Sequence, residues 1–251
     1  MSSPTTVAIV TGASRGLGQA LALGLLNHDT HVITISRTHD AGLARHAQDS
    51  GYTLEQIQAD LANPAAAERV AQDVVANLPT TAQRYILINN AGRVEPIGMA
   101  DDLNLAAEVT AAFSLNVTSA ILLTATFLKA VKPLQADVRI MNISSGAGRN
   151  PMPGWGVYCA TKAALDHYSV VVNAEQHGVR ITSIAPGVID TSMQQTIRGQ
   201  APTAFPAVDR FQEMHRSGQL AAAPEIAARL LRFLHSPDYG RTVIDDIRHH
   251  A

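Results

Sequence analysis

The chain has 251 residues, of which 46% are hydrophobic and 16% are charged, and its formal net charge at pH 7 is −2. A chain of this length and composition can bury enough surface to fold as one domain without disulfides or a structural metal. The charge offers no basic surface for nucleic acid or anionic lipid. The lone cysteine, Cys159, excludes a disulfide framework and a cysteine-built zinc site, and we expect no metal site.

The N-terminus gives no sign of a targeting segment. Met1–Thr6 is short and polar, and the apolar run after it, Val7–Val10, has the length of a strand. No run approaches the roughly 18 apolar residues of a membrane helix. We therefore expect a cytoplasmic protein that has no membrane partner.

Apolar runs of strand length alternate with amphipathic segments along most of the chain. In chain order, strands are expected at Val7–Val10, His31–Ile35, Leu54–Gln58, Tyr85–Ile88, Val138–Ile143, Val179–Ile184 and Thr242–Ile244. Helices are expected at Leu17–Leu26, Ala65–Leu78, Leu105–Lys132, Tyr158–Gln176 and Pro224–Leu234. This alternation predicts one α/β domain, a Rossmann-type doubly wound parallel sheet with helices on both faces.

One stretch, residues 191–223, breaks the alternation. It contains Gly199, Pro202, Pro206 and Gly218 among scattered apolar residues. We interpret it as an excursion over the carboxyl edge of the sheet, where folds of this class bind ligands. It is expected to act as a substrate lid.

A glycine-rich loop joins the first strand to the first helix. Gly12, Gly16 and Gly18 lie in the segment Thr11–Gly18. Glycines allow a tight turn and let a phosphate group approach the N-terminus of the helix. With a strand before it and a helix after it, the loop predicts a nucleotide site, and a plain strand–helix turn is the alternative.

The end of the second strand indicates which dinucleotide would bind. NAD-binding folds tend to carry Asp or Glu here, which binds the ribose 2′-hydroxyl. In this chain Ser36 takes that position, Arg37 follows, and Arg15 lies in the glycine loop. Because a guanidinium pairs with phosphate through two parallel hydrogen bonds, we expect NADP(H), with its 2′-phosphate between Arg15 and Arg37. Two solvated surface arginines are the alternative.

Tyr158 and Lys162 lie four residues apart on a predicted helix, so their side chains share one face. A nearby cation favours phenolate and should lower the pKa of Tyr158 from its reference value of about 10, which suits a general acid. A serine hydroxyl from Ser144-Ser145 could bind a carbonyl oxygen. Alone, the pair would be better explained as an amphipathic surface pair, but beside a nucleotide loop it predicts a catalytic site.

These motifs together resemble the short-chain dehydrogenase/reductase family over nearly the whole chain. The matching segments, in the family's order, are Thr11–Gly18, Asn89–Gly92, Ser145, Tyr158-x-x-x-Lys162 and Pro186-Gly187. The resemblance implies that Tyr158 donates a proton, that Lys162 lowers the pKa of this tyrosine and holds the nicotinamide ribose, and that Ser145 orients the carbonyl. Asn116 fits a fourth catalytic position, which helps to hold a proton-relaying water.

The resemblance also implies which residues contact the cofactor, NADPH or NADP⁺. Asp60 and Leu61 fit the adenine contact, and Val188 and Thr191 fit contacts to the nicotinamide carboxamide. The complete expected set is Gly12, Ser14, Arg15, Gly16, Leu17, Gly18, Ser36, Arg37, Asp60, Leu61, Asn90, Ala91, Gly92, Tyr158, Lys162, Pro186, Gly187, Val188 and Thr191. By the same resemblance, a homodimer or homotetramer would pair through the two longest helices.

Two branches of the family are similar to longer segments. Gly154–Cys159 and Pro186–Gln195 resemble sepiapterin reductases and, still more, bacterial benzil reductases that form (S)-benzoin. Sepiapterin reductases anchor the pterin with an Asp near the C-terminus. Asp245 matches that Asp only with a one-residue shift, so a solvated acidic pair, Asp245 and Asp246, explains it better.

Four apolar residues are expected to line a substrate slot: Trp155, Met193, Phe205 and Phe211. Trp155 could instead be a packing anchor. Such a slot suits an aromatic ketone or a 1,2-diketone. The sequence thus predicts an NADPH-dependent carbonyl reductase. A pterin reductase and an NADP(H)-binding sensor or scaffold without turnover are the alternatives.

Overall fold

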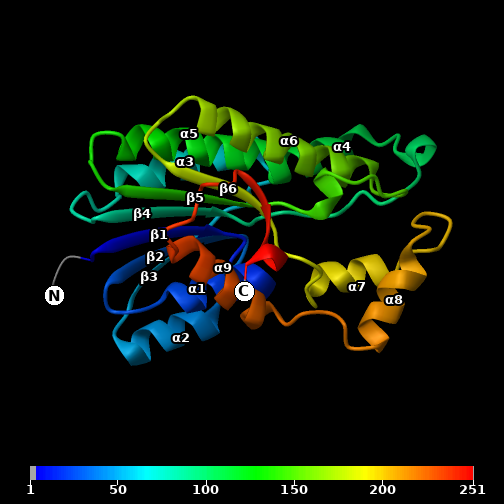
Figure 1. Cartoon of the computed structure of the whole chain (residues 1–251), viewed down its shortest axis with the longest axis horizontal. Helices are drawn as coiled ribbons and strands as arrows, with labels where there is room; N and C mark the ends of the chain where they lie inside the picture. Colours follow the sequence, from blue (N-terminus) through cyan, green and yellow to red (C-terminus); the bar gives the residue numbers. More distant parts are fainter. Residues whose placement is uncertain (1–3, 251) are drawn as a thin grey trace.

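The computed structural model describes residues 4–250, which form a parallel seven-stranded sheet between two layers of helices (Figure 1). The strands are β1 (Thr6–Thr11), β2 (Thr30–Ser36), β3 (Thr53–Gln58), β4 (Arg84–Asn89), β5 (Asp137–Ile143), β6 (Arg180–Ala185) and β7 (Ile244–Asp246). Their order across the sheet is β3-β2-β1-β4-β5-β6-β7. The winding direction reverses between β1 and β4, and the carboxyl ends of strands at such a switch point flank a ligand crevice.

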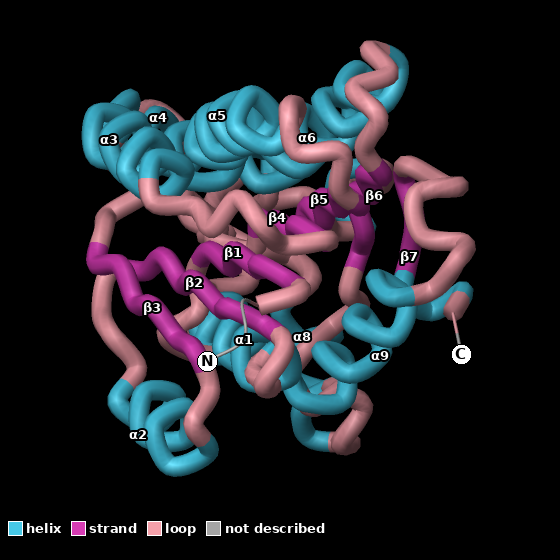
Figure 2. The backbone as a smooth tube through the Cα atoms, turned by 90° about the vertical axis from the view of Figure 1, so that its left-hand side faces the viewer, coloured by secondary structure: helices cyan, strands magenta, loops and turns pink. Residues whose placement is uncertain are grey.

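Helices cover both faces of the sheet, as expected. They are α1 (Gly16–Leu25), α2 (Ala41–Ser50), α3 (Pro64–Ala76), α4 (Ala106–Phe113), α5 (Ser119–Val131), α6 (Gly156–Ala174), α7 (Ser192–Arg198), α8 (Val208–Arg216) and α9 (Ala223–His235). Figure 2 shows α1, α2 and α9 below the sheet and α3 to α6 above it. The predicted doubly wound single-domain fold is confirmed.

The core has two halves because side chains alternate between the faces of each strand. Val7 and Ile9 of β1 pack under α3 and α5, whereas Ala8 and Val10 pack on α1 and α9. Both sets are buried to 1% exposure or less. Continuous apolar strands therefore lie between two hydrophobic layers, which explains why these runs were recognisable as strands.

The long helix expected at Leu105–Lys132 is α4 and α5 joined by one π-helical turn, Ser114–Thr118. Within the described chain, residues 106–131 are the helical stretch long and apolar enough to cross a membrane. Of its 18-residue apolar window 44% is buried inside the protein, and Leu123 and Phe127 lie in the core against β4 and β5. These contacts are those of a core helix.

The segment 191–223 leaves the sheet beyond its carboxyl ends and carries α7 and α8, which the sequence pattern did not predict (Figure 1). Two backbone hydrogen bonds close it at its base, from Asp190 N to the Ala221 carbonyl at 3.0 Å and from Ala221 N to the Val188 carbonyl at 3.1 Å. The strand after α9 also begins later than expected, at Ile244, because only Ile244–Asp246 pairs with β6.

Candidate active site

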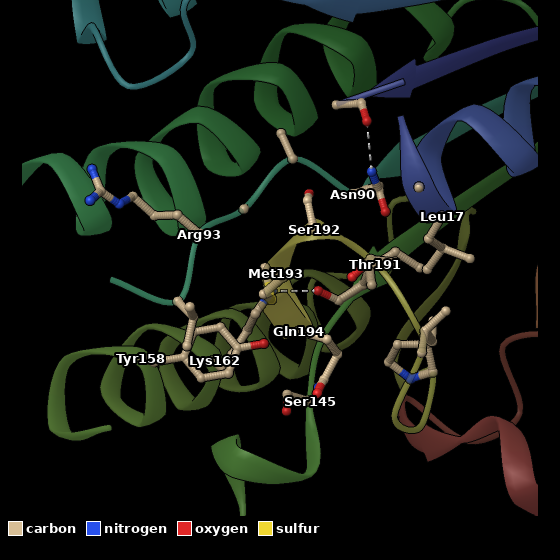
Figure 3. Close-up of a pocket in the computed structure, with 18 of the residues that line it drawn as sticks. Leu17, Asn90, Arg93, Ser145, Tyr158, Lys162, Thr191, Ser192, Met193 and Gln194 are labelled. Carbon is tan, nitrogen blue, oxygen red and sulfur yellow. Dashed lines mark hydrogen bonds between the residues drawn. The ribbon is translucent and has the colours of Figure 1, made fainter. Parts of the chain in front are cut away.

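A cavity of about 1090 Å³ opens at the carboxyl ends of the strands. Its walls come from the β1–α1 loop, the ends of β2, β4, β5 and β6, the start of α6 and the segment 191–223 (Figure 3). Every residue expected to contact the cofactor lines this cavity, as do Ser145, Trp155, Met193 and Phe211. Asn116 and Phe205 are the predicted site residues that do not line it.

The glycine loop is shaped by close approach of backbones. Gly12 and Gly16 have φ angles of +68° and +59°, which favour glycine. A Cβ atom on Gly18 would collide with the Gly12 carbonyl oxygen and the Asn90 side-chain amide. Arg15 precedes α1 without a side-chain cap, so the free N–H groups and positive dipole of this helix end face the cavity. This geometry suits a phosphate group.

Thr11 ties the glycine loop to the end of β4. Its hydroxyl oxygen accepts hydrogen bonds from the backbone N–H groups of Asn90 and Ala91, each at 2.9 Å. The Asn90 side chain donates in return to the Thr11 carbonyl at 2.9 Å. Sequence reasoning did not identify this role of Thr11, which depends on the juxtaposition of β1 and β4.

The end of the cavity beside the glycine loop carries two arginines. Arg15 and Arg37 are exposed and line it, and among residues 4–250 neither lies within 4.0 Å of a carboxylate. The Ser36 hydroxyl donates a hydrogen bond to the Thr38 carbonyl at 2.8 Å. Asp60 accepts from Ala62 N at 3.0 Å and so shapes its own loop. Two cations that lack partners fit a 2′-phosphate better than a 2′-hydroxyl.

Tyr158 and Lys162 lie on the first two turns of α6, and Figure 3 shows them near Ser145. Lys162 Nζ donates to the Ile143 carbonyl at 2.7 Å and lies 5.7 Å from the centre of the Tyr158 ring. Ser145 is the residue before a short 3₁₀ turn, and its hydroxyl accepts from Ala147 N at 3.2 Å. A phenol, an ammonium and a hydroxyl thus converge at the end of β5.

Burial controls the ionisation of both α6 residues. It raises the pKa of Tyr158 to about 12, and the nearby Ser145 hydroxyl only partly opposes this. Burial likewise lowers the pKa of Lys162 to about 8, against the raising effect of Asp166. The expectation that the cation lowers the pKa of Tyr158 below its reference value is therefore wrong for this structure, because desolvation outweighs an ammonium held by the Ile143 carbonyl.

Asn116 lies in the π-helical turn, and its side chain is fully engaged by the protein. Its Oδ1 accepts from Arg93 N at 2.8 Å, and its Nδ2 donates to the Arg93 carbonyl at 2.8 Å and to Thr161 Oγ1 at 3.0 Å. A Cβ atom on Gly92 would lie 3.3 Å from Asn116 Oδ1 and 3.7 Å from Lys162 Nζ. Asn116 is therefore behind the cavity wall, separated from Lys162 by a glycine.

The substrate end of the cavity is aromatic. Trp155 packs edge-on against Tyr158, with ring centres 5.4 Å apart, and lines the cavity beside Met193 and Phe211. Phe205 has no exposed surface and stacks behind Trp155 at 4.8 Å, so its assignment to the slot is wrong. Trp155 serves both as wall and as packing anchor, because it joins the segment 191–223 to α6. The sequence also missed other apolar lining residues: Val94, Ile197 and Met214.

The C-terminal acidic pair is not solvated. Asp245 and Asp246 are 6% and 4% exposed. Asp245 Oδ2 lies 2.8 Å from His250 Nε2, and Asp246 Oδ2 lies 2.6 Å from Arg248 Nη2. Asp246, not Asp245, lines the cavity. The burial of this acidic pair could not be predicted from the sequence, because β7 has only three residues and shows no alternation of apolar and polar side chains.

Comparison with known proteins places the chain among enzymes. The family model described as short chain dehydrogenase matches residues 6–202. A benzil reductase ((S)-benzoin forming) of Bacillus cereus is 36% identical over 231 residues, which cover 90% of this chain and 92% of that protein. A sepiapterin reductase of Bos taurus is 34% identical over 249 residues, covering 93% of this chain and 91% of that one. The crystal structure of a short-chain dehydrogenase/reductase from Burkholderia vietnamiensis is 34% identical, with a TM-score of 0.69 and coverage of 98% and 99%.

Proposed function

The chain belongs to the short-chain dehydrogenase/reductase family, an oxidoreductase family, and on that premise we propose that it reduces a ketone to a secondary alcohol with NADPH. One observation carries the proposal. Tyr158, Ser145 and Lys162 meet at an aromatic wall, and the other end of the same cavity holds two arginines that no carboxylate of residues 4–250 approaches within 4.0 Å. A carbonyl group and a phosphorylated dinucleotide are the ligands that these two ends fit.

In the proposed reaction the ketone lies beside Trp155, with its oxygen toward the Ser145 hydroxyl and the Tyr158 phenol. When NADPH is bound, its nicotinamide supplies the hydride that goes to the carbonyl carbon. Tyr158 gives its phenolic proton to the carbonyl oxygen. A pKa of about 12 keeps this phenol protonated at neutral pH, and the alkoxide that forms is a stronger base than phenolate.

Ser145 and Lys162 support this proton transfer. The Ser145 hydroxyl stabilises charge that develops on the carbonyl oxygen. Lys162, fixed by the Ile143 carbonyl, places a positive charge near the phenolate that remains after transfer. Asn116, through Arg93 and Thr161, keeps the chain around Lys162 in place.

We propose an aromatic ketone or a 1,2-diketone as the substrate class. The relative from Bacillus cereus is named for the reduction of benzil, and the wall of Trp155, Met193 and Phe211 suits planar apolar rings. The segment 191–223 would act as a lid, since Phe211 and Ile197 pack over Trp155 and Tyr158 in one cluster.

A pterin is the second candidate substrate. The sepiapterin reductase of Bos taurus is 34% identical, and the Asp246 carboxylate lies at the cavity wall, where it could accept hydrogen bonds from a pterin. Its ion pair with Arg248 competes with this role. We therefore place the diketone first.

A panel of carbonyl compounds tests the proposal. NADPH absorbance is followed with purified protein and benzil, 1-phenyl-1,2-propanedione, sepiapterin, an aromatic ketone or an aldehyde, each repeated with NADH. Turnover of the diketones with NADPH is the expected result. Faster turnover of sepiapterin would favour the pterin candidate, and NADPH binding without turnover of any compound would favour a sensor or scaffold.

We also propose that the protein is a homodimer or homotetramer. Leu105 and Phe113 at α4, and Val170 and Val171 on α6, are exposed large apolar side chains on the same helical layer. Covering them would remove apolar surface from water. Light scattering during size-exclusion chromatography is expected to give a mass of two or four chains.

A further inference from the structure

An ion pair between a buried carboxylate and a partly exposed arginine, which the proposed reaction does not use, connects the turn after Ser145 to α6. Arg149 Nε lies 3.1 Å from Asp166 Oδ2, and Asp166 is only 4% exposed. The other oxygen of this carboxylate accepts from the Ser183 hydroxyl of β6 at 2.6 Å. Arg149 Nη2 also donates to the Asp245 carbonyl at 2.9 Å. One carboxylate therefore joins the Ser145 turn, α6, β6 and, through Arg149, the C-terminal strand.

The contact between this turn and α6 leaves no free space. A Cβ atom on Gly148 would lie 2.9 Å from the carbonyl carbon of Lys162 and 3.1 Å from Asp166 Oδ2. Tyr158, Lys162 and Asp166 follow one another at intervals of four residues, so they share one face of the helix. The turn after Ser145 therefore contacts the face of α6 that carries Tyr158 and Lys162.

We propose that Asp166 is a positioning residue for the reductase site, which holds the turn carrying Ser145 in register with Tyr158 and Lys162. This inference rests on the proposed carbonyl reduction. Asp166 does not line the cavity, so it acts through Arg149 and through its own helix rather than on the substrate. Small errors in the distance between a hydroxyl and a phenol that bind the same oxygen cost large factors in rate.

Asp166 also influences the charge of Lys162. Burial lowers the pKa of Lys162 to about 8, and Asp166 is the charged group that raises it. The ammonium also lies beside the Tyr158 ring and the Ile143 carbonyl of β5, and Gly92 separates it from the Asn116 amide; none of these groups is charged at neutral pH. Arg149 and Ser183 face Asp166 from the other side. Loss of the carboxylate charge should therefore let Lys162 lose its proton at lower pH.

Asp166→Asn tests both effects, because it keeps the size of the side chain and removes its charge. With benzil, the variant is expected to lower kcat by about 10- to 100-fold while the Kd for NADPH stays within about twofold. The alkaline limb of its pH–rate profile should move to lower pH by about half a unit or more. A wild-type kcat and an unmoved alkaline limb in folded Asp166→Asn would overturn the inference.

Arg149→Met removes the contact that positions the Ser145 turn but keeps the Asp166 carboxylate and its effect on Lys162. It also serves as the test if Asp166→Asn does not fold, because the Arg149 side chain is 29% exposed and tolerates substitution better. It should lower kcat similarly without moving the alkaline limb downward. Asp238→Asn removes a carboxylate from the exposed pair with Arg241 and is the matched control, expected to be unchanged. A wild-type kcat in Arg149→Met would contradict the positioning role proposed for Asp166. The proposed carbonyl reduction would not be affected by that result. Inactivity of the unmodified protein on every carbonyl would overturn the proposed function and, with it, this inference.

Discussion

Tyr158 and Lys162 are buried side chains for which the protein interior favours the neutral form. The structure nevertheless gives the lysine a hydrogen-bond acceptor, the Ile143 carbonyl, and gives the phenol a neighbouring hydroxyl on Ser145. A protonated phenol at neutral pH is the state a proton donor needs before reaction. This protonation state suits the proposed reduction of a carbonyl, in which Tyr158 donates a proton.

Arg37 is expected to set the choice between dinucleotides. Arg37→Asp replaces a cation at the end of β2 with a carboxylate, which should repel a 2′-phosphate and accept a hydrogen bond from a 2′-hydroxyl. The KM for NADPH should rise by about 10- to 100-fold and the KM for NADH should fall. Steady-state kinetics with both cofactors measure this, with Arg45→Asp on α2 as the control. If the ratio of the KM values for NADPH and NADH were unchanged in Arg37→Asp, Arg37 would not be the residue that binds the 2′-phosphate.

We expect cofactor binding to depend strongly on the loop between β1 and α1. In Gly18→Ala, the new methyl group would strike the Gly12 carbonyl and the Asn90 amide, both of which are held by β1 and β4. NADPH affinity should fall by at least about tenfold, with a loss of stability of about 1–3 kcal/mol. Calorimetric titration and urea unfolding measure the two effects.

Gly199→Ala is the matched control for this change. Its Cβ would meet the Gln195 carbonyl at 3.4 Å, an ordinary contact, at a backbone φ of −83°. It should leave both NADPH binding and stability nearly unchanged. If Gly18→Ala behaved like Gly199→Ala, close backbone approach would not be what the loop requires glycine for.

Elements with strong apolar patterns were predictable from the sequence, and weakly patterned ones were not. Strands such as β1 and β4 are buried on both faces, and their central residues form continuous apolar runs, Val7–Val10 and Tyr85–Ile88. In contrast, α2 buries only Leu43 and Ala47, so local signals define it: an Asp40 cap at its start and Gly51 at φ +69° after its end. The helices α7 and α8 were missed for a similar reason, since few of their residues are buried.

The candidate site was predictable where motifs fix neighbours in sequence, and less so where contacts come from distant segments. The glycine loop and the Tyr158–Lys162 pair are local patterns. Two other contacts depend on how separate segments pack: Phe205 lies behind Trp155, and the Asn116 amide is hydrogen-bonded to Arg93. Desolvation of Tyr158 is likewise a property of the folded molecule, which is why the direction of its pKa shift was predicted wrongly.

For the whole molecule, the edge of the sheet opposite the cavity contributes to stability. There Asp137 lies 2.8 Å from Arg84 Nε, 2.8 Å from Arg139 Nη2 and 2.6 Å from Arg180 Nη2. Burial alone would raise the pKa of Asp137, but hydrogen bonds from the three arginines hold it well below its usual range. Each arginine is on β4, β5 or β6, so one carboxylate connects three adjacent strands.

Asp137→Asn should therefore lower the free energy of unfolding at neutral pH by about 2–4 kcal/mol. A carboxyl group whose pKa is depressed on folding stabilises the protein above its unfolded pKa, about 3.9, and loses this contribution as the pH falls. The difference between variant and unmodified protein should accordingly shrink on acidification. Urea unfolding of both proteins, from neutral pH down to about pH 4, measures this difference in the free energy of unfolding. A difference that does not depend on pH would contradict the role of the Asp137 charge.

We propose that this oxidoreductase reduces a carbonyl with a proton from Tyr158, and the variant Tyr158→Phe removes that proton. The measurement is NADPH oxidation with benzil by the unmodified protein and the variant, with the Kd for NADPH determined on the same preparations. We predict turnover by the unmodified protein, a rate about 10²- to 10⁴-fold lower in the variant, and a Kd that changes by less than about twofold. Equal rates in the two proteins would show that the phenolic proton of Tyr158 takes no part in the reaction, and the proposed role of Tyr158 would be wrong.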